Sequence, residues 1–234
     1  MKFIFGTFIY DYQRITQNRK TLSLTVSPDS SITLKCPDNI DNEKIQLFLQ
    51  KKWFWLEKQL SFFKQYQRKI YKREYISGEG CLYLGRQYKI VIKNSTEDKV
   101  VLTRGQLIVN TRRQVSNSSY NKKLIDEWFL NRIKVVFDDR FSEIQSKFGY
   151  HDTSGYSIRE MRRRWGSILK QKKVLLNPKL IHASKDCIDY VITHELCHRK
   201  YKNHDKRFYK YLQEKYPRWE KVKDKLEILG SMIY

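Results

Sequence analysis

The 234-residue sequence predicts an α+β fold, and three patterns lead to this prediction. Two groups of short segments alternate apolar and polar residues, as strands with one buried face do. Each group is followed by a long stretch with apolar residues at helical spacing, and a third helical pattern lies near residue 190. With 40% hydrophobic and 14% aromatic residues, the chain can bury a core as one large domain or two small ones.

The first strand group covers residues 22–36, with a turn at 27–30 between its two alternating runs. Asp41 then caps a predicted amphipathic helix. Its apolar positions are Ile45, Phe48, Leu49, Leu56, Leu60 and Phe63. We interpret the adjacent aromatic stripe, residues 53–55, as core packing and not as a platform on which bases stack.

The second strand group covers residues 82–109 and has turn residues at Gly85, Asn94 and Gly105. A helix is predicted from about Ser119 to Phe148, and Gly149 ends it. Residues 112–119 are polar and are the best place to divide the chain. The predicted domains are therefore 1–115, a β-rich N-terminal region with an aromatic amphipathic helix, and 116–234, which contains the helical pattern near residue 190.

The last third is predicted to hold two strands, at 158–167 and 173–177, joined by a basic turn and forming a small antiparallel sheet. Pro178 stops the second strand. The next helix has Ser184 as its N-cap and Asp186 in its first turn, with an apolar face that continues to Leu196. A further helix is predicted from about Asp205 to Lys215, closed by Pro217.

The helix after Ser184 carries the most informative motif of the chain. His194, Glu195 and His198 form the pattern H-E-x-x-H, and His204 follows six positions later. Two histidines four residues apart share one face of a helix and can bind one metal ion. Glu195 is turned about 100° away, where it can reach a metal-bound water. A third ligand beyond the helix would complete a zinc site with an open position, which is typical of zinc hydrolases and most often of peptidases.

The cysteines and the hydrophobic segments indicate the cellular compartment of the protein. The four cysteines are scattered and indicate reduced thiols in a cytosolic protein; they are Cys36, Cys81, Cys187 and Cys197. We expect Cys197, inside the motif, to be a small buried hydrophobe. The apolar N-terminal run is short and lacks a cleavage site, and no segment has the ~20 apolar residues of a membrane span. We therefore predict a cytoplasmic protein that does not contact a membrane.

The net charge of +22 favours polyanionic partners, either nucleic acid or acidic protein surfaces. Basic residues concentrate in three segments, 51–73, 159–179 and 199–225. A basic solvated face is the alternative interpretation, since no nucleic-acid recognition motif accompanies the charge.

Several short motifs together resemble one family, the YgjP-like zinc metallopeptidases, which are related to SprT-like and Wss-type peptidases. The matching residues span about 50 positions: Arg164-Trp165-Gly166-Ser167, Leu176-Asn177, Leu180, Asp189-Tyr190-Val191, His194-Glu195-Leu196, His198, Asn203-His204 and Phe208. The resemblance implies that residues 116–234 are a zincin-like catalytic domain, whose core is an antiparallel strand pair beside the H-E-x-x-H helix. It also implies one Zn²⁺ per chain with His204 as third ligand, and Glu195 as the catalytic carboxylate.

The chain departs from the family pattern at two positions. Ile168 stands where the family usually has a cysteine, and Tyr209 where tryptophan is common. The histidine spacing also equals that of the metzincins, but those enzymes need a glycine before the third ligand. Tyr201 occupies that position here and is disfavoured at positive φ, whereas Asn203 tolerates that conformation. The YgjP-like interpretation is therefore preferred.

The predicted function is zinc-dependent peptide hydrolysis through a metal-activated water, with Glu195 as general base. Arg164, Trp165 and Tyr201 are the candidate substrate-binding residues. The run 162–164 could line the cleft, contact phosphates or face water. The second oxyanion donor stays open among four candidates, Tyr190, Tyr201, His151 and His182.

Two alternatives remain at this level. A basic nucleic-acid-associated protein with a structural zinc would keep its function when Glu195 becomes Gln. A zinc hydrolase of a non-peptide substrate would need Glu195 but cleave no polypeptide. The sequence leaves the oligomeric state open.

Overall fold

The computed structural model describes residues 1–27, 29–66, 73–150, 155–162 and 164–233, with the side chains of 62–66 and 231–233 excepted. The chain divides into two compact units, Met1–Ile70 with Gly230–Tyr234, and Tyr71–Leu229. This packing boundary lies well before the predicted 115/116 boundary, because strands 80–111 share one core with the C-terminal helices. The assignment of the catalytic domain to residues 116–234 stays a prediction.

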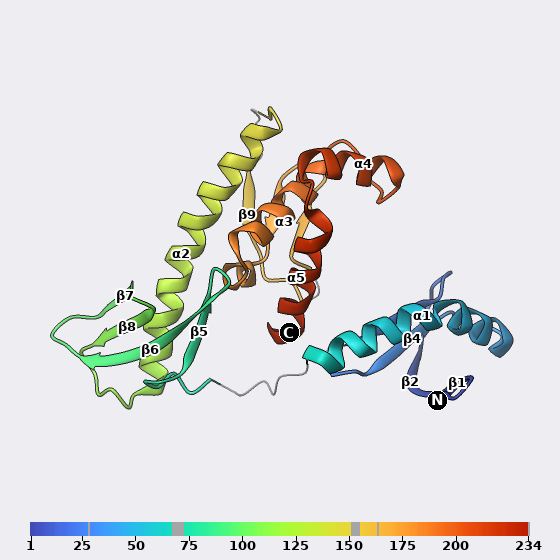
Figure 1. Cartoon of the computed structure of the whole chain (residues 1–234), viewed down its shortest axis with the longest axis horizontal. Coiled ribbons are helices and arrows are strands. Elements are labelled where there is room, and N and C mark those ends of the chain that lie inside the picture. Colours follow the sequence, from blue (N-terminus) through green and yellow to red (C-terminus); the bar gives the residue numbers. More distant parts are fainter. Residues whose placement is uncertain (28, 67–72, 151–154, 163, 234) are drawn as a thin grey trace. The chain divides into compact units, whose positions relative to one another are not determined.

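The first unit contains a four-stranded sheet and one long helix (Figure 1). Its strands are β1 (Lys2–Phe5), β2 (Phe8–Thr16), β3 (Ser23–Val26) and β4 (Ile32–Cys36), in the order β1-β2-β4-β3. β2 and β4 pair in parallel, and the other pairs are antiparallel. The helix α1 (Asn42–Tyr66) begins after Asp41, whose carboxylate accepts a hydrogen bond from the Glu43 N–H. The sequence prediction missed β1 and β2.

The aromatic stripe of α1 is only partly core, which corrects the sequence interpretation. Trp53 packs on Phe5 and Phe8 and donates a hydrogen bond to the Tyr10 hydroxyl. Phe54, however, is 75% exposed and Trp55 39% exposed. Three consecutive residues of a helix cover about 200° of its circumference, so they cannot all face one sheet.

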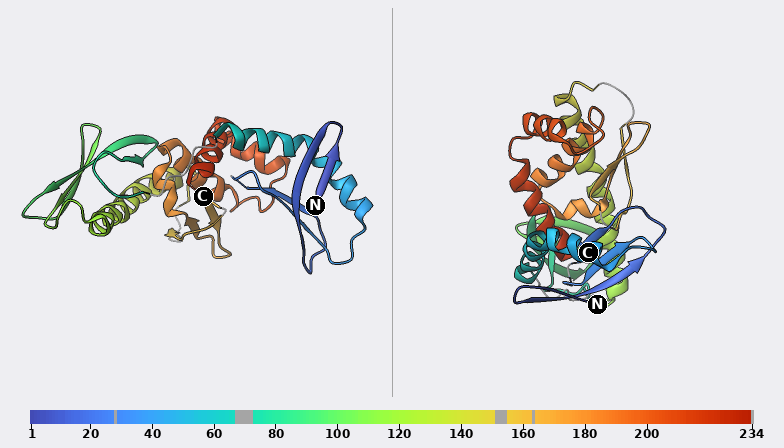
Figure 2. Two further views of the ribbon diagram at one scale, coloured as in Figure 1. Left: turned by 90° about the horizontal axis from the view of Figure 1, so that it is seen from below. Right: turned by 90° about the vertical axis from the view of Figure 1, so that its right-hand side faces the viewer.

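The second unit begins with a sheet of the same topology (Figures 1 and 2). β5 (Gly80–Tyr83), β6 (Arg86–Asn94), β7 (Lys99–Thr103) and β8 (Gln106–Thr111) lie in the order β5-β6-β8-β7, again with the middle pair parallel. A long helix, α2 (Ser118–Lys147), follows and ends before Gly149 at φ +66°. Both units thus open with four strands and a helix, although the sequence shows no repeat.

A three-stranded sheet lies beside the helices of the second unit. β9 (Tyr156–Ile158), β10 (Gly166–Ile168) and β11 (Val174–Leu176) form it in the order β10-β11-β9. The β10–β11 pair is antiparallel as predicted, but β9 adds in parallel, so the sheet is mixed. The predicted strand 158–167 is interrupted because the buried Asn177 amide donates to the carbonyls of Met161 and Arg164 and fixes a loop there.

The remaining elements are a 3₁₀ turn η1 (Pro178–His182) and three helices, α3 (Lys185–Cys197), α4 (Lys206–Lys215) and α5 (Trp219–Ile233). The sequence prediction missed α5. α3 lies between α2, β10 and β11, with Ile188, Ile192 and Leu196 fully buried. The described chain thus confirms the α+β class, with five α-helices and three small sheets that each contain parallel and antiparallel pairs.

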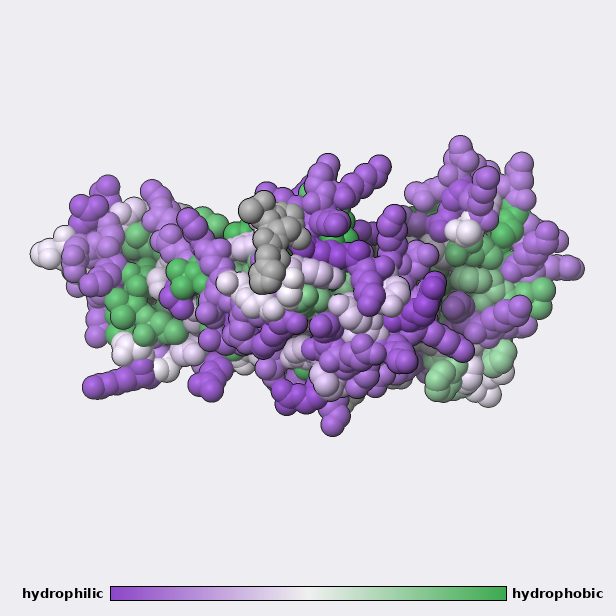
Figure 3. Space-filling view, turned by 90° about the horizontal axis from the view of Figure 1, so that it is seen from above, coloured by the Kyte–Doolittle hydropathy of each residue, from purple (hydrophilic) through white to green (hydrophobic). Residues whose placement is uncertain are grey.

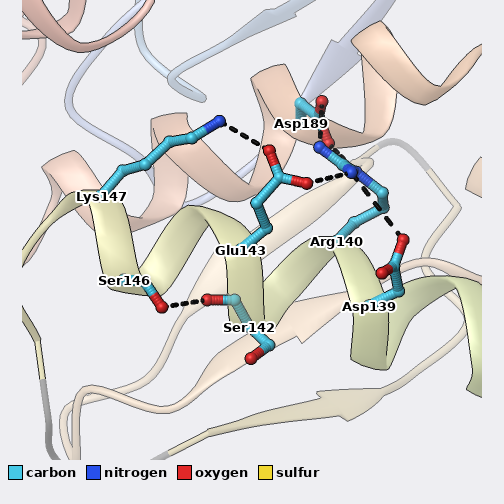
Figure 4. Close-up of polar contacts among 7 residues, drawn as sticks. All are labelled: Asp139, Arg140, Ser142, Glu143, Ser146, Lys147 and Asp189. Atoms are coloured by element: carbon cyan, nitrogen blue, oxygen red, sulfur yellow. Dashed lines mark hydrogen bonds and ion pairs between the residues drawn. The ribbon is translucent and has the colours of Figure 1, made fainter.

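A mostly buried ion pair joins α2 to α3 (Figure 4). The Arg140 guanidinium donates to both carboxylate oxygens of Asp189, at 2.6 and 2.8 Å. Arg140 also contacts Glu143, which in turn accepts from Lys147. The two-point geometry fixes the angle of the guanidinium and therefore the register of α3 on α2.

The surface is mainly hydrophilic on the face that Figure 3 shows, with hydrophobic patches between the polar side chains.

All four cysteines are free and buried. Cys197 is 0% exposed, as predicted for a small buried hydrophobe. Within the described residues, no helix combines the length and hydrophobicity that crossing a bilayer needs.

Candidate active site

Three histidine side chains meet at the C-terminal end of α3. His194 lies in the last turn of this helix, His198 is its C-cap, and His204 comes from the turn before α4. The Nε2 atom of His204 is 2.9 Å from that of His194 and 3.1 Å from that of His198. These three residues are a group that could hold a metal ion.

Two local features hold His204 in this position. The Asp205 carboxylate accepts from the N–H groups of Arg207 and Phe208, so α4 starts directly after His204. The ring of Phe208 is fully buried and lies 4.6–5.0 Å from all three imidazole rings, measured between centroids. The start of α4 and this aromatic ring therefore complete the histidine triad.

The donor set fits a zinc ion. The Nδ1 atom of His198 lies 3.0 Å from the Tyr201 carbonyl oxygen, which can only accept, so Nδ1 carries the proton and Nε2 presents its lone pair. Three imidazole nitrogens with one position left open are the ligand set of catalytic zinc sites. Zn–N bonds of about 2.0–2.1 Å at tetrahedral angles place the nitrogens about 3.4 Å apart, close to the spacing in the triad.

Burial favours the neutral form of two of these imidazoles, His194 and His204, and metal ligation requires the neutral form. Loss of hydration lowers the pKa of His194 to about 3, with smaller contributions from His198, His204 and Lys223. Burial also lowers the pKa of His204, and the charges of His198 and Lys223 add to this effect.

Glu195 lies beside the triad and is 8% exposed. Burial raises the pKa of its carboxyl to about 8, and the Arg164 charge opposes this shift. Strand β10 passes directly over it, since a Cβ on Gly166 would lie 2.9 Å from Glu195 Oε1. A carboxyl with a pKa near the working pH can both accept and return a proton.

The triad and Glu195 open into a cavity of about 570 Å³. β10 forms one wall with Gly166, Ser167 and Ile168, and α3 forms another. In the part of the chain that the structure describes, β10 is an edge strand of its sheet, so one side of its backbone has no strand partner there. The other described lining residues are Arg164, Trp165, Tyr190, Val191, Lys202, Lys223, Leu226 and Glu227.

Comparison with known protein families shows the family of the chain. A family model described as YgjP-like, metallopeptidase domain, matches residues 20–228. The chain belongs to the YgjP-like family. This confirms the resemblance that the sequence motifs indicate. Membership in a metallopeptidase family supports, at family level, a zinc peptidase that acts on polypeptides.

Two crystal structures of archaeal metallopeptidase zymogens are also similar to parts of this YgjP-like chain. Abylysin of Pyrococcus abyssi is 20% identical over 38% of this chain and 90% of its own, with a TM-score of 0.36. Jannalysin of Methanocaldococcus jannaschii is 26% identical over 42% of this chain and 97% of its own, also with a TM-score of 0.36. TM-scores this low do not establish a shared fold. No curated protein matches the chain.

The predicted substrate-binding residues of the YgjP-like protein differ in whether they line the cavity. Arg164 and Trp165 line the cavity. Tyr201 is not among the described lining residues; its ring packs on Tyr211 and its carbonyl holds His198. In the basic run, Arg162 is exposed and residue 163 lies outside the described residues.

The candidate oxyanion donors also differ in their position relative to the cavity. Tyr190 lines the cavity and is 6% exposed. His182 is directed elsewhere, with its Nδ1 atom 2.7 Å from the Leu82 carbonyl oxygen. His151 lies outside the described residues.

Sequence reasoning missed the contribution of α5 to the cavity. Lys223, Leu226 and Glu227 all come from this helix. The spacing of Val222, Leu226 and Leu229 was the signal that could have revealed an amphipathic helix there.

Proposed function

We propose that this YgjP-like protein is a zinc-dependent endopeptidase with a zincin-type core, in which Glu195 is the general base. The observation that carries the proposal is the convergence of three histidines and one buried carboxyl on a single cavity next to an edge strand. Family membership supports the reaction class.

The histidines His194, His198 and His204 are the proposed ligands, which makes one metal ion per chain. A zinc ion held there would supply a Lewis acid and would lower the pKa of water in its open position. The fixed tautomer of His198 supports its role as a nitrogen donor.

Glu195 is proposed to move one proton twice. It accepts the proton of a water molecule while the oxygen of that water adds to the peptide carbonyl carbon. It then gives this proton to the amide nitrogen as the C–N bond breaks, so that an acid and an amine leave. The raised pKa of the carboxyl suits both steps.

Two further groups are proposed to bind the peptide. The free edge of β10 can pair with substrate backbone as an added strand. The Tyr190 hydroxyl is the proposed donor to the carbonyl oxygen as negative charge develops on it, since Tyr190 is the one oxyanion candidate among the described lining residues.

The test is proteolysis of casein by the zinc-loaded protein, with Glu195→Gln and the exposed Glu214→Gln as matched variants. The proposal predicts cleavage by the parent and by Glu214→Gln, and a loss of about 10²–10⁴-fold in Glu195→Gln with zinc retained. Equal cleavage by both Glu variants, or none by the parent, would contradict it.

The two sequence-level alternatives predict other outcomes. A nucleic-acid-associated protein with a structural zinc, which the charge of +22 favours, would bind DNA or RNA equally well as Glu195→Gln. A zinc hydrolase of another substrate class would require Glu195 without cutting casein.

A further inference from the structure

Three cationic side chains are among the described residues that line the cavity, and each comes from a different segment of the chain. Arg164 precedes β10, Lys202 lies in the turn between α3 and α4, and Lys223 lies on α5. The carboxylates among the described lining residues are Glu195 and Glu227. With Glu195 assigned to proton transfer, Glu227 is the remaining carboxylate among the described lining residues that can balance the three cations.

Lys223 is a cation of the cavity lining with a weakly held ion-pair partner, Glu227. Its Nζ atom is 3.6 Å from Glu227 Oε1, which is beyond hydrogen-bond distance. Both side chains are nearly half exposed, at 45% and 46%. Such an exposed pair four residues apart on a helix contributes little stability, so Glu227 is easily exchanged for another carboxylate.

Lys223 also lies close to the proposed metal ligands, because it lines the same cavity as His194, His198 and His204. A substrate group that binds Lys223 would therefore lie near the peptide bond that the triad and Glu195 address.

We propose that the cavity selects acidic polypeptide segments, and that Lys223 binds an Asp or Glu side chain of the substrate close to the scissile bond. An ammonium group suits this role because it accepts a carboxylate from many directions. Arg164 and Lys202, which line the same cavity, add attraction and raise the local concentration of anionic segments. The proposal rests on the proposed peptidase function for the cleavage step, but the binding preference can be measured without catalysis.

The test is fluorescence anisotropy with zinc-loaded Glu195→Gln protein, which binds substrate without turning it over. The probes are a fluorescein-labelled peptide of alternating Ala and Glu, and two matched peptides with Gln or Lys in place of Glu. Lys223→Glu is then introduced into this background. Lys221→Glu is the matched control, because Lys221 is exposed on the same helix, is not a described lining residue and gives the same change of net charge.

The expected result is binding of the Glu peptide about fivefold tighter than the Gln peptide, an effect that weakens as salt is added. Lys221→Glu keeps this ratio, whereas Lys223→Glu removes it and favours the Lys peptide. Equal affinity for the Glu and Gln peptides overturns the proposal. So does an equal loss in both lysine variants, since the preference would then come from the overall charge.

Casein cleavage by the parent protein, measured alongside, keeps the two proposals apart. Selective binding without any cleavage would contradict the peptidase function and leave the acidic preference standing. Cleavage without selective binding would do the reverse.

Discussion

Gly166 on β10 and Glu195 on α3 approach so closely that no side chain fits between them. A Cβ atom on Gly166 would lie 2.9 Å from both Cγ and Oε1 of Glu195, and 2.8 Å from Cγ1 of Val191. Real Cβ atoms do not show contacts this short, so any larger residue must displace the carboxyl or the strand. The edge strand and the proposed general base are therefore positioned by the same glycine.

Gly166→Ala is expected to reduce kcat for peptide cleavage by about 10²-fold, because a displacement of about 1 Å at a reacting group has that effect. Zinc content should stay at the parent level, since the three atoms nearest to the added Cβ belong to Val191 and Glu195 and not to a histidine. Gly80→Ala is the control, because a Cβ there meets only the flexible end of Gln87. Steady-state kinetics of the two variants are the measurement, and parallel losses in both would refute the positioning role.

Tyr190→Phe removes only a hydroxyl from the cavity. If this hydroxyl stabilises the developing oxyanion, kcat should fall by about 10²–10³-fold while KM changes little. Tyr88→Phe, which removes a phenol that is not among the described lining residues, should match the parent. A rise in KM at constant kcat would assign Tyr190 to substrate binding instead.

The Arg140–Asp189 pair is expected to stabilise the packing of α3 on α2. Both side chains are only 12–13% exposed, so removing one partner leaves a charge with little access to water. Asp189→Leu should lower the free energy of unfolding by about 2–4 kcal/mol, and adding Arg140→Met should restore much of that loss. Urea unfolding of the single and double variants tests this. Additive losses would show that the two side chains do not act as a pair.

The buried side chain of His182 is expected to make the free energy of unfolding depend on pH. Burial lowers the pKa of this imidazole below its usual 6.5, and the charges of Arg73 and Lys179 add to the effect. The folded state thus binds the proton less readily than the unfolded state. The stabilisation that the neutral His182 contributes is therefore fully present above about pH 6.5. As the pH falls below this value, the free energy of unfolding decreases by up to about 1.4 kcal/mol per pH unit.

Urea unfolding at about pH 7.5, 6 and 5 checks this prediction, with His182→Asn as the comparison. The variant keeps an amide donor for the Leu82 carbonyl but has no proton to gain. Its stability should fall less steeply between about pH 6.5 and 5. Parallel curves for the two proteins would show that His182 titrates normally.

The sequence revealed those parts of the site that depend on local spacing. The positions of His194, Glu195 and His198 follow from helical periodicity, and the start of α4 follows from the capping residue Asp205. The approach of Gly166 to Glu195 could not be predicted, because it depends on how a strand packs against a helix about thirty residues away in the chain. The acidic preference proposed for Lys223 also required the structure, since it depends on the placement of α5.

In the fold, too, the elements with a clear local pattern were predicted and those that depend on long-range packing were not. The strands from β3 to β8 were readable from alternation, and α2 from its long helical pattern. β9 was missed because its parallel pairing with β11 leaves no turn in the sequence. The exposure of Phe54 was missed because its aromatic neighbours hide the helical period.

Zinc per chain, measured by elemental analysis of protein purified without chelators, tests the central claim most directly. The parent protein should contain about one zinc ion per chain, and His204→Ala, which removes one of the three proposed ligands, should contain far less. A parent protein that holds no zinc and takes up none when it is added would contradict the account of a zinc peptidase.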